Sequence, residues 1–516
     1  MIQFKNKQSY LKNKILNLNQ LENKIKEIKR NKKKVVLCHG VFDLLHIGHI
    51  KHFESAKKNG DILVVTITAD EYVEKGPNRP HFNTTLRAEA LSSIGIIDYI
   101  SINYSDNASE MIKKIKPNIY FKGIEYKNEK SDLTGMIKIE RLAIKSVGGK
   151  ILYSDNETFS SSNLLNKYTD IFSQNQKTFI SKIKKKFDIK KINKMINDFN
   201  NVKVLVIGET IIDEYVFCEA LGKSGKEPVL VFKDFGREQY LGGALAIARH
   251  LSTFCKNISV LSTLGEKREQ ENFIKKTIEK NIKLNFLRKS KSPTIIKKRF
   301  IDRIDNRKVF GVYSINDDHL NPLEEKKMIK KFNSLNKKFD LIIVADYGHG
   351  MITPKVAKHI SNKKNFYSLN AQINSTNIGL HSIYKYNKID SLIINASELK
   401  YEMNQREGDL FKLARKFKDR VKSKYLNVTE GKRGAFTIDK KNKMVNCPAF
   451  AMDPIDKVGA GDAFLSILSL CQFKKFDNEL SLFLSSIAAA KSANTIGNKS
   501  PIKKSNILKT VLHLLK

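Results

Sequence analysis

Apolar and polar positions follow one another in two separate blocks, each with the pattern of an α/β domain. In each block, short runs of β-branched and other apolar residues predict strands, and helix-like segments lie between them. Because strands that alternate with helices form parallel sheets, we expect an α/β fold in both blocks. No internal repeat relates the two blocks, so we expect two different folds. The predicted strands are 35–41, 61–67, 98–102 and 118–123 in the first block, and 258–265, 339–348, 391–397 and 425–431 in the second.

Two polar, basic segments precede these blocks. Residues 1–33 carry apolar residues at helical spacing, and residues 169–201 are charged, with helical periodicity and no strand pattern. The sequence therefore predicts a helical lead-in at 1–33, a first domain at 34–168, a helical linker at 169–201 and a larger second domain at 202–516. The apolar positions of the lead-in are Ile15, Leu18, Leu21, Ile25 and Ile28.

Composition indicates a cytoplasmic protein. A chain of 516 residues with 41% hydrophobic residues can build more than one core. It has no run of eighteen apolar residues, so we expect no membrane span, and its N-terminal segment lacks the apolar stretch of a secretory signal. The five cysteines are scattered without a CxxC pair, which argues against a disulfide framework or a zinc site.

The net charge of +40 suits phosphate-rich ligands or nucleic acid. The lysines are spread almost evenly, however, and the densest runs, at 24–34 and 182–191, lie in predicted helices or linkers. We therefore favour a solvated surface over a nucleic-acid groove and expect no specific nucleic acid as partner. A nucleic-acid-binding protein stays as an alternative that rests on charge alone and predicts salt-sensitive binding to any duplex.

The sharpest local pattern is CHGVFDLLHIGH at 38–49, where a predicted strand turns into a predicted helix. Gly48 leaves room for backbone to approach a phosphate, and the amides and dipole of a helix N-terminus favour an anion. His46 and His49 are three residues apart and can reach the same anion. During nucleotidyl transfer they would neutralise charge on the α-phosphate as pyrophosphate leaves. Taken alone, the two histidines fit this role and that of helix caps or metal ligands about equally well.

Residues 34–168 resemble the HxGH cytidylyltransferase-like family, because further blocks of that family follow in order at 75–80, 87, 117–126 and 159–162. The resemblance implies a Rossmann-like nucleotidylyltransferase. Class I aminoacyl-tRNA synthetases share the HIGH tetrapeptide, but the KMSKS loop that accompanies it is not found here. The resemblance implies His46, His49 and Lys75 as catalytic residues and Gly40, Phe42, Asp43, Gly48, Arg87, Lys122, Gly123, Ser160, Ser161 and Ser162 as nucleotide or phosphate ligands.

The nucleotide stays open between ATP and CTP. The region is most similar to the adenylyltransferase half of bacterial heptose kinase/adenylyltransferases. Cytidylyltransferases of the glycerol-phosphate type usually carry an arginine five residues before the first serine of the cluster, and Asp155 stands there. The aspartate at this position favours ATP over CTP.

A second pattern, DKVGAGDAF at 456–464, precedes an apolar helical run. A glycine-rich turn at a helix start forms an anion hole suited to a migrating phosphoryl group. Asp462 is placed to accept the proton of an attacking sugar hydroxyl. In isolation such an aspartate is often only a helix cap.

Residues 202–516 resemble the PfkB/ribokinase family of sugar kinases, with family signatures in order at 208–213, 242–243, 346–350, 395–398 and 429–434. The resemblance implies a ribokinase-like domain that uses Mg²⁺ and ATP. Its implied residues are the catalytic base Asp462, the sugar ligands Asp213, Gly242, Gly243 and Asp456, the magnesium residues Asn395 and Glu398, and the nucleotide ligands Thr429, Gly431, Gly434, Gly459, Ala460 and Gly461.

Three departures from the heptose kinases stand out. Ala246 replaces a usual asparagine, the usual DPK segment reads Asn370-Ala371-Gln372, and the domain order is reversed. They motivate an alternative in which the second domain is a catalytically idle sugar-binding module, against which the intact Asp462 counts.

Together the two domains predict a bifunctional sugar-activating enzyme. The kinase would phosphorylate a sugar or a heptose-phosphate-like sugar phosphate, and the transferase would join a sugar 1-phosphate to a nucleoside monophosphate with release of pyrophosphate. Such a product would serve surface polysaccharide synthesis. The alternative for the first domain is a CTP-dependent transferase for a polyol phosphate. We expect Mg²⁺ and ATP, or CTP, as cofactor and co-substrate, small molecules as partners, and no membrane; the oligomeric state stays open, with a homodimer as the candidate assembly.

Overall fold

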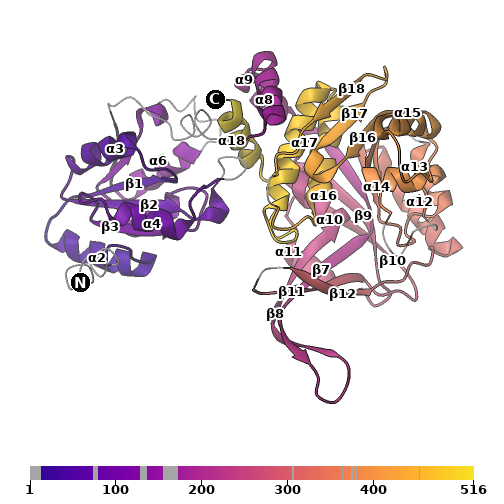
Figure 1. The fold of residues 1–516 in the computed structure, drawn as a ribbon, viewed down its shortest axis with the longest axis horizontal. Helices are drawn as coiled ribbons and strands as arrows, with labels where there is room; N and C mark the ends of the chain where they lie inside the picture. Colours follow the sequence, from indigo (N-terminus) through magenta and orange to yellow (C-terminus); the bar gives the residue numbers. More distant parts are fainter. Residues whose placement is uncertain are drawn as a thin grey trace. The chain divides into compact units, whose positions relative to one another are not determined.

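The computed structural model describes residues 13–73, 79–127, 136–154, 172–304, 307–362, 364–373, 377, 381–451 and 454–515. The chain forms two compact units, one from 1–173 with 508–516 and one from 174–507 (Figure 1). Both units carry parallel sheets with helices on the faces, which confirms the predicted α/β class. Among the described residues, no helix is long and apolar enough to cross a membrane.

The first unit is built on a five-stranded parallel sheet in the order β3-β2-β1-β4-β5. Its strand side chains alternate between two cores, so that Leu37 packs with α2, α5 and α6 and Cys38 packs with α3 and α4. The elements are α2 (Leu18–Arg30), β1 (Val35–Gly40), α3 (Ile47–Lys57), β2 (Ile62–Thr68), α4 (Thr84–Ser92), β3 (Tyr99–Asn103), α5 (Ser109–Ile115), β4 (Ile119–Lys122), α6 (Met136–Ser146) and β5 (Lys150–Tyr153).

The lead-in is only partly helical. The Asn17 and Gln20 side chains form a capping box, so α2 begins at Leu18. Ile15 instead forms a parallel bridge with Ile100 of β3, and the Leu16 amide donates to the Ile100 carbonyl over 2.9 Å. The prediction of a helix through Ile15 is therefore wrong, because the unpaired edge of β3 offers this segment backbone partners.

The second unit contains a nine-stranded sheet in the order β10-β9-β6-β13-β14-β15-β16-β17-β18, parallel except for its last two strands. A separate four-stranded sheet, β12-β11-β7-β8, forms what we call the lid. The strands are β6 (Lys203–Gly208), β7 (Thr210–Lys223), β8 (Leu230–Gly243), β9 (Asn257–Leu264), β10 (Ile282–Arg288), β11 (Ile295–Asp302), β12 (Lys308–Ser314), β13 (Leu341–Asp346), β14 (Phe366–Ala371), β15 (Ile389–Asn395), β16 (Ser423–Thr429), β17 (Ala435–Ile438) and β18 (Met444–Cys447).

Helices cover both faces of the nine-stranded sheet. Helices α10, α16 and α17 lie on one face and α12 to α15 on the other (Figure 1). The lid projects from this body, and β12 is exposed along its whole length. From residue 174 onward the helices are α8 (Gln174–Lys186), α9 (Ile189–Asn197), α10 (Ala244–Ser252), α11 (Glu271–Thr277), α12 (Pro322–Asn336), α13 (Pro354–Ser361), α14 (Ala396–Glu402), α15 (Leu410–Val421), α16 (Ala460–Phe473), α17 (Asn478–Ala493) and α18 (Lys504–Leu515).

Helix α8 packs within the second unit. The rings of Phe179 and Phe483 have centroids 6.3 Å apart, and the Gln176 amide donates to the Ala449 carbonyl over 2.6 Å. Lys186 forms an ion pair of 2.7 Å with Asp477 at the start of α17.

Candidate active sites

The glycine-rich turn of the second unit begins α16. Gly459 is the residue before the helix and has φ +86°, a conformation that L side chains rarely adopt. A Cβ at this position would lie 2.0 Å from Asn498 Oδ1. The turn therefore requires glycine, and it presents the N-terminus of a fourteen-residue helix together with Ala460 and Gly461.

Asp462 lies in the first turn of this helix and is buried. The Tyr347 hydroxyl donates to its Oδ1 over 2.9 Å. Burial raises the pKa of Asp462 to about 7, although the Tyr347 hydrogen bond works in the opposite direction. A carboxyl group with this pKa can take up and release a proton near neutral pH.

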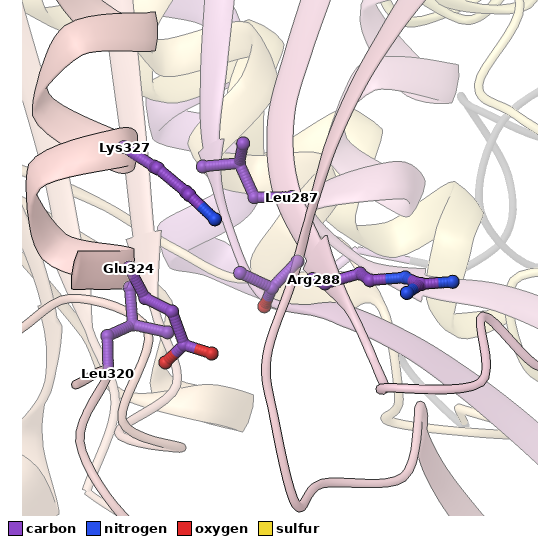
Figure 2. A pocket seen from close by; sticks show the side chains of 6 residues that line it. Leu287, Arg288, Leu320, Glu324 and Lys327 are labelled. Atoms are coloured by element: carbon purple, nitrogen blue, oxygen red, sulfur yellow. The ribbon is translucent and has the colours of Figure 1, made fainter.

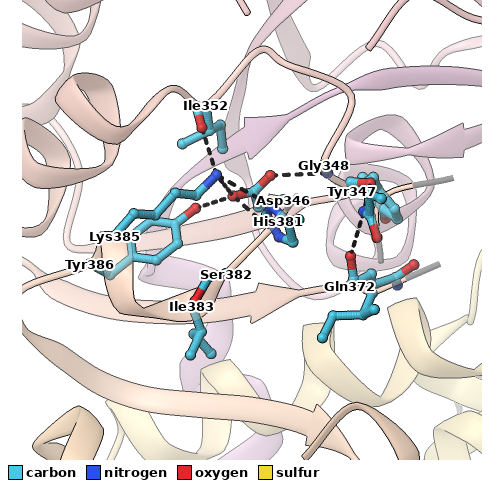
Figure 3. A network of polar contacts seen from close by, with 12 residues as sticks. Asp346, Tyr347, Gly348, Ile352, Gln372, His381, Ser382, Ile383, Lys385 and Tyr386 are labelled. Carbon is cyan, nitrogen blue, oxygen red and sulfur yellow. Dashed lines mark hydrogen bonds and ion pairs between the residues drawn. The ribbon is translucent and has the colours of Figure 1, made fainter. Parts of the chain in front are cut away.

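The loop that carries Tyr347 is held by two buried carboxyl groups. Glu209, which follows β6, accepts from the Tyr347 amide over 3.0 Å and from the His349 amide over 3.2 Å. Asp346 accepts from the Gly348 amide of this loop over 3.1 Å, from Lys385 over 2.6 Å and from the Tyr386 hydroxyl over 2.5 Å, as Figure 3 shows. Burial opposes ionisation of Asp346, but the Lys385 ammonium keeps its pKa below the ordinary value. The two carboxyl groups thereby fix the loop against the strand ends.

The expected sugar ligands lie where the lid joins the body. Asp213 on β7 forms an ion pair of 2.5 Å with Arg299 on β11. A Cβ at Gly242 would lie 2.3 Å from Asp213 Oδ2, and Gly243 adopts φ +59°, so both glycines leave space that a side chain would fill. The structure therefore brings Asp213 and the glycine pair together. Ala246 is buried in α10.

Asp456 is already engaged by protein donors. Its carboxylate accepts from the Tyr215 hydroxyl and from Lys308, each over 2.5 Å, and from the amides of Val458 and Gly497. Because Tyr215 and Lys308 come from the lid strands β7 and β12, Asp456 ties the lid to the turn before α16. The sugar contact predicted for Asp456 would require some of these bonds to be exchanged.

The predicted nucleotide residues meet at the carboxyl ends of neighbouring strands. Asn395 of β15 pairs in register with Thr429 of β16. Gly434 adopts φ +104°, and a Cβ there would lie 2.1 Å from the Cys447 carbonyl oxygen, whereas Gly431, at φ +58°, has open space around it. Ligands of open α/β sheets bind at this edge.

Asn395 and Glu398 form a capping box at the start of α14. The Asn395 side chain accepts from the Ser397 amide, and Glu398 accepts from the amides of Asn395 and Ile373. Burial raises the pKa of Glu398 to about 7, and the described part of the chain contains no cluster of three or more His, Cys, Asp or Glu residues that could hold a metal. A buried carboxylate without a cationic partner suits Mg²⁺ held through water and nucleotide phosphates, and an all-protein cage is not formed by the described residues.

In the first unit, His46 and His49 lie side by side at the start of α3. Their ring centroids are 4.0 Å apart, and His46 caps the helix by accepting from the Gly48 amide over 3.1 Å. Phe42 adopts φ +49° and places its ring beside Gly40, where a Cβ would lie 2.9 Å from Phe42 Cζ. The structure thus brings together the residues of the CHGVFDLLHIGH segment around one helix N-terminus.

Three other predicted ligands have internal partners. All three Arg87 guanidinium nitrogens donate to protein oxygens, including the Val41 carbonyl and Asp70 Oδ1 over 2.5 Å. Asp43 accepts from the amides of His81 and Phe82. Lys122 forms a buried ion pair of 3.1 Å with Glu140. The phosphate contacts predicted for Arg87 and Lys122 would require these bonds to be exchanged.

The remaining predicted residues fall into two groups. Gly123 precedes the short 3₁₀ turn after β4. Lys75 and the serine cluster at 160–162 lie outside the described residues, as does Asp155.

Sequence reasoning missed Lys297 and Arg299 of β11. Their spacing of two residues on a strand places both side chains on the face that carries Asp213, since Lys297 pairs in register with Asp213. That alternation could have revealed them, but the strand itself was not predicted. A small pocket between β10 and α12 is lined by none of the predicted site residues (Figure 2).

Comparison with known proteins decides the family of the second unit. Residues 201–504 match the model of the pfkB family carbohydrate kinases. The chain belongs to the pfkB family. Residues 37–167 match the model described as cytidylyltransferase-like, so the predicted pairing of a kinase-type and a transferase-type domain is confirmed.

The curated relatives carry the name bifunctional protein HldE. The bifunctional protein HldE of Campylobacter jejuni is 27% identical over 306 residues, which cover 58% of this chain and 62% of the relative. The HldE proteins of Aliarcobacter butzleri and Campylobacter concisus are 40% and 41% identical over 121 and 123 residues, covering 23% of this chain and 25% and 26% of the relatives. The chain therefore spans less than two thirds of the length of these relatives.

Solved structures of a phosphofructokinase and a ribokinase align with the chain at low identity. Phosphofructokinase-2 from Escherichia coli covers 61% of this chain and 100% of its own, at 14% identity and a TM-score of 0.49. Ribokinase from Thermotoga maritima covers 60% and 99%, at 18% identity and a TM-score of 0.46.

Proposed function

We propose that the second unit transfers the γ-phosphoryl group of ATP to a hydroxyl of a sugar or sugar phosphate. The observation that carries this proposal is the buried Asp462 carboxyl group at the start of α16, with a pKa of about 7 and a hydrogen bond from Tyr347. The family match and the register of the nucleotide motifs support it.

In this reaction the hydroxyl oxygen of the sugar attacks the γ-phosphorus of ATP, and ADP leaves. The Asp462 carboxylate accepts the proton of that hydroxyl group. The amides and dipole at the start of α16 stabilise negative charge on the migrating phosphoryl group. Asp213 and the glycine pair hold the acceptor below the lid. Mg²⁺, bound with the ATP phosphates near Asn395 and Glu398, would neutralise phosphate charge.

For the first unit we propose nucleotidyl transfer. A phosphate oxygen of a sugar 1-phosphate attacks the α-phosphorus of ATP or CTP, and pyrophosphate leaves. His46 and His49 share one helix start and together face a single anion, which lets them stabilise charge on the reacting phosphates. No covalent enzyme intermediate is required.

The two reactions together make a bifunctional sugar-activating enzyme with a heptose-phosphate-like substrate. The substrate class rests on the resemblance to heptose kinase/adenylyltransferases and on the HldE relatives, which are themselves named bifunctional.

The test is product analysis with the whole protein. Purified enzyme is incubated with magnesium and either ATP or CTP, together with heptose 7-phosphates, heptose 1-phosphates and hexose phosphates, and the products are identified by mass spectrometry. We expect a mass gain of one phosphate in the kinase reaction, and a nucleotide sugar plus pyrophosphate in the transferase reaction with ATP. If a nucleotide sugar forms with CTP and not with ATP, CTP is the substrate of the transferase. A folded protein that phosphorylates no sugar would contradict the kinase function.

A further inference from the structure

A pair formed by the buried His349 and the partly exposed Asp317 lies beside the kinase site and has no place in the chemistry described so far. His349 follows β13 in the same loop as Tyr347, the donor to Asp462. Its ring is buried, and its Nδ1 lies 2.7 Å from Asp317 Oδ1. Its Nε2 is buried as well and has no hydrogen-bond partner among the described residues.

The Asp317 contact determines what Nε2 can do. An ionised carboxylate only accepts hydrogen bonds, so the proton of the neutral imidazole lies on Nδ1 and Nε2 carries the lone pair. Burial, aided by the nearby Lys297 ammonium, lowers the pKa of His349, although the Asp317 bond opposes this. The ring is therefore neutral at physiological pH, and Nε2 is a hydrogen-bond acceptor.

The backbone around His349 leaves little freedom to the ring. The His349 amide donates to Glu209, and the His349 carbonyl accepts from Lys289 over 2.9 Å. A buried acceptor left without a donor has lost its hydrogen bonds to water without replacement, which is energetically unfavourable. A ring held this firmly with an unpartnered nitrogen is the pattern of a group prepared for a ligand.

The position of the pair indicates the acceptor side of the site. Lys297 pairs in register with Asp213 on the neighbouring lid strand, and its charge acts on both His349 and Asp462. The nucleotide motifs lie on β15 and β16, separated from β13 by β14 in the sheet order. A ligand group that meets His349 Nε2 therefore belongs to the molecule held by Asp213.

We propose that His349, oriented by Asp317, is a specificity-determining residue of the kinase, and that its Nε2 accepts a hydrogen bond from an acceptor hydroxyl other than the one that is phosphorylated. The inference rests on the proposed kinase function. It predicts an enzyme that requires a hydroxyl donor at one further position of its sugar.

The experiment uses the full chain and kinase rates at saturating ATP. The acceptor probes are D-glycero-D-manno-heptose 7-phosphate, sedoheptulose 7-phosphate and fructose 6-phosphate. For the probe that is phosphorylated, we expect His349→Ala to raise the acceptor KM at least tenfold with an unchanged KM for ATP. His349→Gln, which restores an acceptor oxygen, should recover part of the loss.

The sharper variant is Asp317→Asn, which keeps the imidazole in place. The carboxamide introduced by this substitution can donate to Nδ1, which moves the ring proton to Nε2 and turns the acceptor into a donor. The acceptor KM should then rise as in His349→Ala. Asp318→Asn, the same change at the exposed neighbouring residue, is the matched control and should leave the KM unchanged.

The outcomes separate the two proposals. If the wild-type protein phosphorylates neither these probes nor any acceptor of the product analysis above, the kinase function falls and this inference with it. If it phosphorylates one and His349→Ala leaves the acceptor KM unchanged, only the inference falls. A rise in the KM for ATP alone would also overturn it, because the imidazole would then serve the nucleotide.

Discussion

The two units prepare phosphate chemistry at a helix N-terminus in different ways. In the second unit the proposed acid–base group is Asp462, a carboxyl group whose pKa burial raises above its ordinary value. In the first unit the proposed charge-stabilising groups are His46 and His49, which are only half-buried. A carboxyl group must leave water to become a useful base near neutral pH, whereas an imidazole titrates there without burial. The residue type therefore decides how deep in the fold the site lies.

The turns before α16 and α3 also differ in how they reach a positive φ. Gly459 provides a positive φ without a side chain, and its Cα packs against Asn498. In the first unit the positive φ belongs to Phe42, whose buried ring packs beside Gly40 and His49. One unit thus uses the absence of a side chain to shape its turn, and the other uses an aromatic anchor.

The largest expected effect that separates the two units is that of a substitution at Asp462. We expect Asp462→Asn to reduce phosphoryl transfer by about 10²–10⁴-fold, because the variant cannot accept the hydroxyl proton. Nucleotidyl transfer by the same preparation should be unchanged. Parallel assays of the two reactions measure this, and loss of both in folded protein would contradict two independent sites.

The reverse change is His49→Ala. Removing one group that stabilises transition-state charge should reduce nucleotidyl transfer by about 10²–10³-fold and leave the kinase rate intact. Pyrophosphate release is the measurement. His52→Ala changes a histidine one turn further along α3, beside the Phe121 ring, and shows how much of the loss comes from altered packing of that helix.

The role of glycine in the kinase turn is tested by Gly459→Ala. The new Cβ would meet Asn498 at 2.0 Å in a positive-φ conformation, so we expect a loss of about 1–3 kcal/mol in the unfolding free energy of the second unit. Thermal or denaturant unfolding measures it. Gly461→Ala provides the stability control, because a Cβ there would meet no atom within 4 Å; equal destabilisation by both variants would refute the steric account.

The smallest expected effect is a shift in a pH profile. Since burial raises the pKa of Asp462 to about 7 and the reaction needs the carboxylate, kinase kcat/KM should rise as the pH rises through about 7. Tyr347→Phe removes the hydrogen bond that lowers this pKa, so the rise should move to higher pH by up to about one unit. An unmoved profile would show that another group controls the rate.

The sequence predicted the helix starts more reliably than their surroundings. The motifs at 38–49 and 456–464 could both be recognised because each combines unusual residues within a few positions. The Tyr347–Asp462 bond joins residues 115 positions apart, so no local pattern could reveal it. The lid strands β11 and β12 were missed because β11 is only partly buried and β12 is exposed, so the apolar runs that mark buried strands are weak there. Lys297 and Arg299 were missed with β11. The internal partners of Arg87 and Lys122 likewise depend on tertiary packing.

Helix α2 packs on the sheet of the first unit, and this affects the choice of fragments for expression. Leu21, Ile25 and Ile28 contribute to one of the two cores of the first unit, yet they precede the family match at residue 37. In the second unit α8 packs at Phe179, ahead of the match at residue 201. A fragment that begins at residue 37 or at residue 201 would expose the apolar surface that α2 or α8 covers. Fragments made for expression should therefore include these helices.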